Sequence, residues 1–136
     1  MTKIEEFGPD HIQQLYQLYQ DEWWTKGRSL EETAAGLAGS QIKIGMVDSE
    51  GRLCGFVRVL TDYVFKAVIF DLLVSPGSRE KGVGARLMEA VKLHPRLAGV
   101  RHFELYCLPE LVSYYERHGF SDKVEGVRLM RRRLGE

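Results

Sequence analysis

The sequence predicts a mixed α/β fold, built as a mostly antiparallel β-sheet flanked by about four helices. Three observations predict this class. An apolar hairpin pattern spans residues 41–60, a buried-strand pattern at 67–74 runs into a helical pattern, and a second strand-to-helix succession follows at 102–118. A hairpin gives antiparallel neighbours whereas a strand–helix–strand crossover gives parallel ones, so the sheet is expected to be mixed.

The N-terminal part of the chain predicts a short edge strand and two helices. Residues 3–7 alternate weakly in polarity, as an edge strand does. Apolar residues recur at helical spacing over about 10–24, which predicts the first helix. Ser29 lies three residues before Glu32, the spacing of a capping box, so a second short helix is expected over 30–37.

The central part of the chain predicts a hairpin and a buried strand. Strands are expected over 41–47 and 53–60, because apolar residues there flank a polar turn, Asp48-Ser49-Glu50-Gly51. Residues 67–74 are almost continuously apolar, which is typical of a central strand covered on both faces.

The C-terminal part predicts two more helices and two more strands. A helical pattern begins at Gly82 and ends at Pro95, and a strand pattern follows over 102–108. A helix is expected over 111–118, closed by Gly119 in a left-handed cap. The alternation over 124–134 predicts a last strand.

Length and composition restrict the partners. A chain of 136 residues is expected to form one domain, 1–136, because single cores usually need about 100–150 residues. Lysine plus arginine balance aspartate plus glutamate at 19 each, so neither nucleic acid nor a membrane surface is expected as a partner. The arginines near the end of the chain are therefore expected to be solvated charges: Arg128, Arg131, Arg132 and Arg133.

The sequence also predicts a cytoplasmic protein without a metal. No apolar run approaches the roughly 20 residues that a membrane span needs, and the first residues lack a signal-peptide core. Cys54 and Cys107 have no paired spacing and are expected to be free thiols. The histidines show no metal-ligand spacing, so no metal site is expected.

The most informative segment is 79–85, Arg-Glu-Lys-Gly-Val-Gly-Ala, between the buried strand and the helix after it. A helix start leaves unpaired amides and a partial positive charge, which attract an anion. Gly82 and Gly84 let a diphosphate approach the backbone, while Arg79 and Lys81 add positive charge. Two such glycines also occur in ordinary tight turns, and the segment matches neither the P-loop nor the GxGxxG pattern.

Segment 79–85 resembles the acetyl-CoA loop of the GNAT acetyltransferases, whose pattern is Gln or Arg, any two residues, Gly, any residue, then Gly or Ala. Arg79, Gly82 and Gly84 match its fixed positions. Residues 114–120, Tyr-Tyr-Glu-Arg-His-Gly-Phe, resemble the family's late FYxxxGF segment with Tyr in place of Phe. The resemblance implies a GNAT-like fold and an N-acetyltransferase that moves an acetyl group from acetyl-CoA to a primary amine by direct attack.

The resemblance also implies site residues. Backbone groups at the end of the buried strand would pair with the pantetheine arm of acetyl-CoA, and one amide would face the thioester carbonyl. The implied cofactor-binding residues are Leu72, Leu73, Val74, Arg79, Glu80, Lys81, Gly82, Val83, Gly84 and Ala85. Tyr115 takes the position of the family's general acid, with Tyr114 as the substitute if the register slips by one. The alternative for Tyr115 is a packed helix tyrosine without a catalytic role.

Asp71 is an acid inside an apolar strand, and burying an unpaired carboxylate is costly. As a catalytic residue it would bind or deprotonate the acceptor amine, with a pKa raised by desolvation. As a structural residue it would be a hydrogen-bonded acid on the outer face of the strand.

Glu22, Trp23 and Trp24 end the first predicted helix, a region that often walls the acceptor site in GNAT enzymes. The tryptophans either seal the helix onto the sheet or leave one ring exposed to stack on the acceptor, a small-molecule or peptide amine. Two rival classes remain, a non-catalytic acetyl-CoA sensor and an interaction module. Edge strands and a C-terminal hairpin would also allow a homodimer.

Overall fold

The computed structural model describes residues 1–135. The chain divides after Tyr106 into two compact units. The larger unit, which begins at Met1, contains the whole sheet and three of the α-helices. The smaller unit begins at Cys107 and contains a short fourth α-helix followed by an extended segment.

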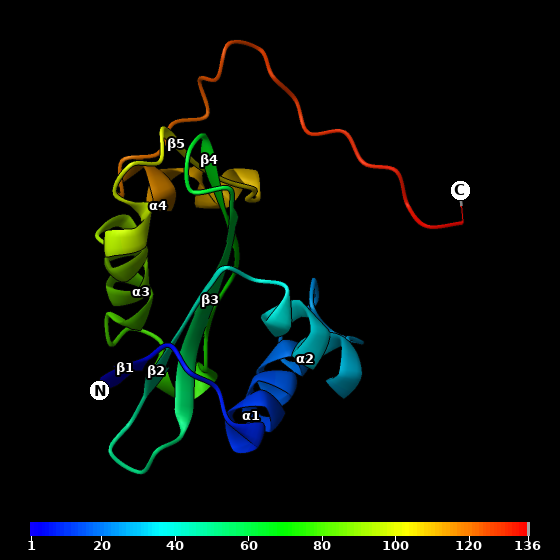
Figure 1. The fold of residues 1–136 in the computed structure, drawn as a ribbon, viewed down its shortest axis with the longest axis vertical. Coiled ribbons are helices and arrows are strands. Elements are labelled where there is room, and N and C mark those ends of the chain that lie inside the picture. Colours follow the sequence, from blue (N-terminus) through cyan, green and yellow to red (C-terminus); the bar gives the residue numbers. More distant parts are fainter. Residues whose placement is uncertain (136) are drawn as a thin grey trace. The chain divides into compact units, whose positions relative to one another are not determined.

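The sheet has five strands in the order β1-β2-β3-β4-β5. Their bounds are Thr2–Ile4 for β1, Ile42–Val47 for β2, Leu53–Thr61 for β3, Lys66–Val74 for β4 and His102–Leu105 for β5. The first three pairs of neighbours are antiparallel and the β4–β5 pair is parallel. The prediction of a mixed, mostly antiparallel sheet is confirmed, and Figure 1 shows β1 at one edge and β5 at the other.

Four α-helices occur within residues 1–135, as expected. They are α1 at Pro9–Gln20, α2 at Leu30–Ala38, α3 at Val83–Lys92 and α4 at Val112–Glu116. The predicted capping box of α2 is present, since Ser29 Oγ accepts from the amide of Glu32 and the Glu32 carboxylate accepts from the amide of Ser29.

Two adjacent residues of β3 show how helices cover both faces of the sheet, because successive side chains of a strand point to opposite faces. Phe56 is fully buried and meets Tyr19 of α1 edge-on, at 6.3 Å between ring centroids. A Cβ added to Gly55 would lie 2.5 Å from Val83 Cγ1 and 3.0 Å from Leu87 Cδ1, both on α3. Accordingly α1 and α2 lie on one side of the sheet and α3 on the other (Figure 1).

The predicted end of the first helix, at about Trp24, is wrong. Helix α1 stops at Gln20, and the next residues form turns. The Thr25 hydroxyl donates to the carbonyl of Tyr19 at 2.7 Å, occupying an acceptor that a continuing helix would use. The amide of Gly27 donates to the side chain of Gln20, which folds the chain back against the helix end.

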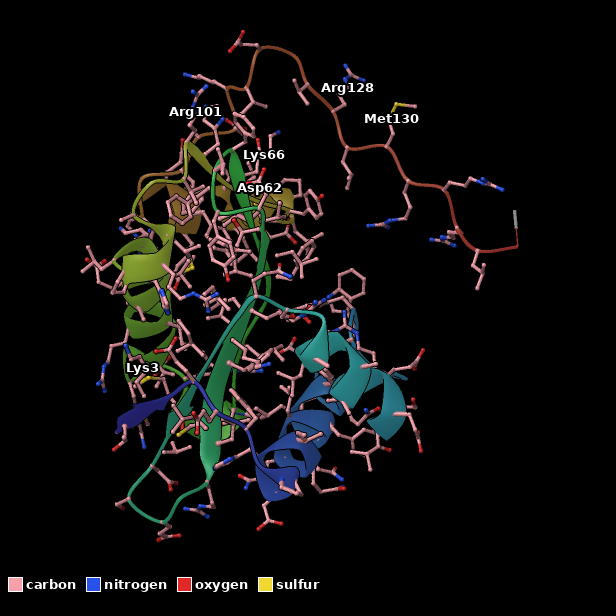
Figure 2. All side chains as sticks on the ribbon, in the orientation of Figure 1. Lys3, Asp62, Lys66, Arg101, Arg128 and Met130 are labelled. Atoms are coloured by element: carbon pink, nitrogen blue, oxygen red, sulfur yellow. The ribbon has the colours of Figure 1, made fainter. Side chains whose placement is uncertain are left out.

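The predicted last strand, 124–134, is also wrong. The structure has no strand over these residues, although the sequence alternates. Side chains there are largely exposed, with Val127 at 73% and Met130 at 92% of full exposure. Figure 2 shows Met130 and Arg128 standing away from this segment. An alternating pattern forms a strand only when a neighbouring strand pairs with its backbone.

The close approach of α3 to β3 gives a first test. Gly55→Ala should lower the free energy of unfolding by about 1–3 kcal/mol, because the added methyl overlaps the stiff Val83 side chain. Gly99→Ala is the matched control, since a Cβ there meets nothing within 4 Å and its φ is not positive. Urea denaturation of both variants measures the difference, and equal stabilities would contradict the packing described.

Candidate active site

Strand β4 carries a β-bulge at Asp71. Phe56 of β3 pairs with Leu73, but Arg58 pairs with Phe70, so β4 has one residue more than β3 over this interval. Asp71 has a φ of +57°, in the left-handed region. Aspartate is among the few non-glycine residues that enter this region with some frequency, and a bulge re-aims the side chain that it contains.

The Asp71 carboxylate accepts hydrogen bonds from three side chains that come from different elements. The Tyr19 hydroxyl donates to Oδ2 at 3.0 Å, and Arg58 Nε donates to the same oxygen at 2.7 Å. Arg28 donates from Nη1 to Oδ2 at 2.7 Å and from Nη2 to Oδ1 at 3.3 Å. Asp71 therefore links α1, the turn before α2 and β3 to the bulge of β4.

These partners decide the ionisation of Asp71. Burial acts to raise its pKa, but hydrogen bonds and positive charge from Arg28 and Arg58 outweigh burial and hold the pKa below its ordinary value. The prediction that desolvation raises this pKa is therefore wrong. The carboxylate is a hydrogen-bonded ion, as the structural alternative expected, but it is buried beneath α1 and the following turn.

Beyond the bulge, β4 has an open edge. Its pairing with β5 ends at Ile69 and Leu105, so residues 70–74 have no strand partner on that side among the described residues. The amide of Ser75 donates to the carbonyl of Cys54 on the β3 side at 2.8 Å. Amides alternate between the two edges of a strand, so the amide of Val74 is directed away from β3. This edge offers backbone groups to an extended ligand.

The open edge leads through a loop to the start of α3. Gly82 is the N-cap of α3, with a φ of +74°, and no side chain caps this end. The amides of residues 83–85 form no hydrogen bond with the rest of the described chain. Because Gly82 reaches a left-handed conformation without strain, the chain can enter α3 with three amides that lack a partner at the helix N-terminus. Segment 79–82 is exposed, as an anion site requires.

The acceptor-site residues expected from the sequence lie in the turns after α1. Glu22 forms an ion pair with Arg79 at 2.8 Å. This pair joins a residue expected in the acceptor site to a residue expected in the acetyl-CoA loop. Trp23 and Trp24 are exposed, at 73% and 41%. The alternative in which both rings seal a helix onto the sheet is therefore wrong.

Tyr115 lies in the smaller unit, where the end of α4 fixes its conformation. The amide of Phe120 donates to the carbonyl of Tyr115 and that of Gly119 to the carbonyl of Glu116, which is the Schellman pattern. Gly119 has a φ of +91°, so the predicted left-handed cap is confirmed. The Tyr115 and Phe120 rings meet edge-on at 6.2 Å.

The surroundings of Tyr115 raise the pKa of its hydroxyl to about 12, chiefly through burial and also through Tyr114 and Cys107. The phenol is therefore protonated at neutral pH. Cys107 is exposed as a residue. Partial desolvation of its sulfur and the negative charge of Asp122 raise the pKa of its thiol, which disfavours a thiolate nucleophile.

Sequence reasoning missed three residues of the Asp71 cluster: Tyr19, Arg28 and Arg58. One signal for Arg58 was available, because Arg58 is the single charged residue in β3 and Asp71 is the single acid in β4. Hairpin pairing brings two such positions close together, and buried charges need opposite partners. Arg28 lies in a turn without periodicity, so no comparable signal marks it.

Comparison with known proteins shows the family. The profile of the acetyltransferase (GNAT) family matches residues 9–120 of this chain, which include both the glycine loop and the Tyr115 segment. The chain belongs to the GNAT acetyltransferase family. It is accordingly an acetyl-CoA-dependent acyltransferase, and the resemblance read from the two motifs is confirmed.

Individual relatives of this acetyltransferase agree with the assignment. An uncharacterized N-acetyltransferase, ycf52, of Porphyra purpurea is 31% identical over 88% of this chain and 70% of its own length. Serotonin N-acetyltransferase 2, chloroplastic, of Oryza sativa is 35% identical over 60% of this chain and 41% of its own length. The crystal structure of a putative GNAT acetyltransferase from Xanthomonas campestris superimposes with a TM-score of 0.81 and 30% identity, covering 98% of this chain and 94% of that one.

Two further findings concern metals and membranes. Among residues 1–135 of this acetyltransferase, no group of three or more His, Cys, Asp or Glu side chains is arranged to hold a metal ion. None of the helices in the part of the chain that the structure describes is long and apolar enough to cross a membrane.

Asp71→Asn should cost roughly 3–5 kcal/mol of stability at pH 7, because it leaves two arginines beside an uncharged amide in a buried site. Urea denaturation measures the loss. Asp21→Asn, at an exposed position, is the matched control and should be close to neutral.

The pH dependence of that difference follows from the lowered pKa of Asp71. A depressed carboxyl pKa contributes stability above its unfolded value, about 3.9, and this contribution is lost as the pH falls through the folded value. The gap between wild type and Asp71→Asn should therefore narrow below about pH 4. A gap that stays constant down to pH 2 would show that Asp71 is not a buried ion.

Proposed function

We propose that this enzyme transfers an acetyl group from acetyl-CoA to a primary amine by direct attack. The observation that carries the proposal is the open edge of β4, which runs from the Asp71 bulge to the uncapped start of α3 at Gly82. In the reaction, the amine nitrogen forms a bond to the acetyl carbon and the carbon–sulfur bond breaks. The leaving thiolate takes up a proton, and the amine releases one.

Two parts of the site would bind different parts of acetyl-CoA, namely the start of α3 with the loop before it, and the open edge of β4. The diphosphate would bind the free amides of residues 83–85, with Lys81 nearby and Arg79 released from, or shared with, Glu22. The pantetheine arm would pair along residues 72–74 as an added strand. An amide on this edge would then donate to the thioester carbonyl as negative charge develops on its oxygen.

Tyr115 is proposed as the general acid that protonates the thiolate. Its raised pKa of about 12 keeps the proton on the phenol until the thioester opens. Asp71 is proposed as a positioning residue, because its oxygens already accept from Tyr19, Arg28 and Arg58. A water molecule is then proposed as the acceptor of the amine proton.

The acceptor is proposed to be a small-molecule or peptide amine that approaches past Glu22, Trp23 and Trp24. Exposed indole rings offer flat faces to an aromatic or cationic acceptor. A cytoplasmic location stays a prediction, since the rice relative is chloroplastic by its name. Release of free thiol from acetyl-CoA in the presence of an amine distinguishes an enzyme from a non-catalytic sensor.

Acetyl-CoA should raise the melting temperature of the protein, because a ligand at about 100 times its Kd adds roughly 2.7 kcal/mol to the stability of the folded state. Differential scanning fluorimetry with and without acetyl-CoA measures the shift. Gly82→Ala should reduce it, since alanine is strained at a φ of +74°. Gly99→Ala should keep the full shift, and no shift in wild type would refute the proposed function.

Tyr115→Phe should lower kcat by about 10²–10⁴-fold, the usual contribution of a general acid, while the KM for acetyl-CoA changes little. Steady-state thiol release measures both constants. Tyr114→Phe is the matched control on the neighbouring residue. If the control loses more turnover than Tyr115→Phe, the role belongs to Tyr114, and unchanged turnover in both variants would remove the general acid from this segment.

A further inference from the structure

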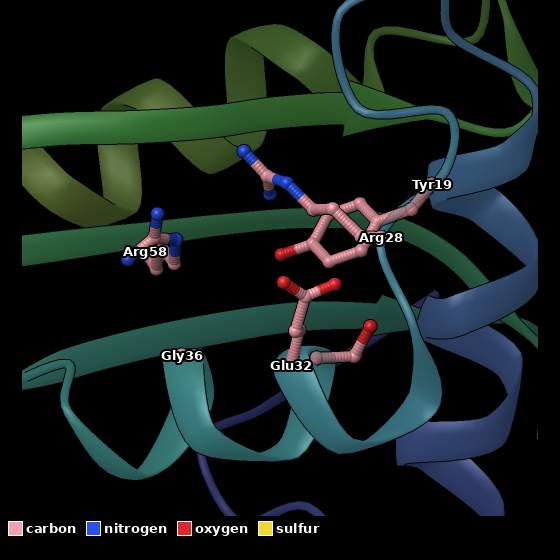
Figure 3. A pocket seen from close by; sticks show the side chains of 6 residues that line it. Tyr19, Arg28, Glu32, Gly36 and Arg58 are labelled. Carbon is pink, nitrogen blue, oxygen red and sulfur yellow. The ribbon is translucent and has the colours of Figure 1, made fainter. Parts of the chain in front are cut away.

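A pocket of about 210 Å³ lies beside the Asp71 cluster. It is lined by Tyr19, Arg28, Glu32, Thr33, Gly36 and Arg58. Figure 3 shows α2 along one wall, with Tyr19 and Arg28 on the opposite side and Arg58 projecting from the sheet. The volume is below the range of about 300–1,000 Å³ that is usual for drug-sized ligands, so the pocket suits a small polar group.

Guanidinium donors remain available in this pocket. Arg58 uses Nε on Asp71 and Nη1 on Ser40, at 3.4 Å, which leaves Nη2 without a partner among residues 1–135. Arg28 uses both Nη atoms on Asp71 and also interacts with the Tyr19 hydroxyl. Both side chains are partly exposed, at 17% for Arg58 and 33% for Arg28. The remaining donors can therefore reach a ligand.

The pocket is surrounded by two arginines and two acids. Two arginines face one carboxylate at Asp71, which leaves one positive charge uncompensated in that cluster. Glu32 is the other acid of the lining, but its carboxylate accepts from the amide of Ser29 at the positive start of α2. With Glu32 included, the two arginines and the two acids sum to zero formal charge, so the preference for an anion depends on the guanidinium donors that remain available and not on net charge.

The arginines are also held in place before any ligand arrives. Asp71 orients both guanidinium groups, and each group lies over an aromatic ring. Arg28 lies 4.6 Å from the ring centroid of Tyr19, and Arg58 lies 5.1 Å from that of Phe70. A planar guanidinium fixed in this way loses little entropy when it binds carboxylate or phosphate oxygens.

The pocket shares the bulge with the acyl-transfer site. Asp71 holds the two arginines, and the next residue, Leu72, is the first of the residues 72–74 along which the pantetheine arm is proposed to pair. The arginine pocket and the proposed acyl-transfer site are therefore supported by adjacent residues of one strand.

We propose that the acceptor of this enzyme carries an anionic group, a carboxylate or a phosphate, close to its amine, and that Arg58 and Arg28 bind this group. The inference rests on the proposed acetyl transfer and specifies its substrate class. The acceptor is then a small amino acid-like or aminoalkyl phosphate-like molecule. Arg28 and Arg58 act as specificity residues rather than as proton carriers.

The test compares matched amines on the full chain with acetyl-CoA, by thiol release. One arm uses amino carboxylates against their carboxamides, and the other uses aminoalkyl phosphates against the corresponding amino alcohols. At least one anionic series should exceed its neutral partner by about tenfold or more in kcat/KM, as expected for hydrogen bonds to a charged group. The two arms decide between carboxylate and phosphate.

Substitutions test whether Arg28 and Arg58 cause the preference for an anionic acceptor. Arg28→Lys and Arg58→Lys keep the charge beside Asp71 but lose the planar donors, so the anionic-to-neutral ratio should fall toward one, mainly through the KM of the anionic acceptor. Arg52→Lys, in the exposed turn after β2, is the matched control and should keep the wild-type ratio. Retention of the acetyl-CoA melting shift in each variant shows that the fold and the cofactor site are intact.

The outcomes separate this inference from the proposed function. If acetyl-CoA does not stabilise the wild-type protein, the proposed function fails. If acetyl-CoA binds and neutral amines are acetylated as well as their anionic partners, only the anionic-acceptor inference fails. The inference also fails if both lysine variants keep the wild-type ratio of kcat/KM for anionic over neutral acceptors. It fails as well if every anionic amine in the panel is neither acetylated nor able to stabilise the coenzyme-bound enzyme further.

Discussion

The buried carboxylate of Asp71 is the interaction on which the rest of the site depends. It accepts from Tyr19, Arg28 and Arg58, and it lies at a bulge in a left-handed conformation, which is uncommon for residues other than glycine. Strained backbone persists only where surrounding contacts determine it. Three donors from three elements provide that determination, so the ion cluster and the bulge stabilise each other.

Strand β4 contributes both to the core and to the proposed cosubstrate site. Strand β4 pairs with β5 only as far as Ile69, and the residues beyond it leave an edge open. The backbone along this edge is available to a cosubstrate, while side chains of the same strand maintain the core, as Leu73 does at 3% exposure. One strand therefore serves stability through its side chains and ligand binding through its main chain. Gly55 adds to this arrangement by letting α3 approach β3 closely, which sets where the helix start lies.

Much of the fold followed from the sequence, because hydrophobic periodicity reports burial directly. The hairpin, the buried strand and the helix from Gly82 all lie where their patterns indicated. The errors arose where one contact outside the pattern decides the outcome. Helix α1 ends early because the Thr25 hydroxyl takes the carbonyl of Tyr19, and residues 124–134 alternate without a strand to pair with. Periodicity contains neither piece of information.

The sequence predicted the glycine positions that shape the backbone of the candidate site, but it did not predict the ion pairs of Asp71. Gly119 was identifiable as a left-handed cap and Gly82 as a position where the backbone is accessible, and both glycines adopt a positive φ. The pKa of Asp71 was predicted in the wrong direction because its partners, Arg28 above all, come from distant segments. Long-range electrostatics depends on tertiary contacts that no local pattern encodes.

Coenzyme A is proposed to bind the open edge of β4 and the free amides at the start of α3. A two-dimensional NMR titration with coenzyme A, followed through the amide resonances, tests this binding mode. We expect selective shifts at Val74 and at residues 83–85, with little change at Val64 and Phe65 in the loop before β4. Unchanged resonances at residues 83–85 in the presence of bound coenzyme A would rule this binding mode out.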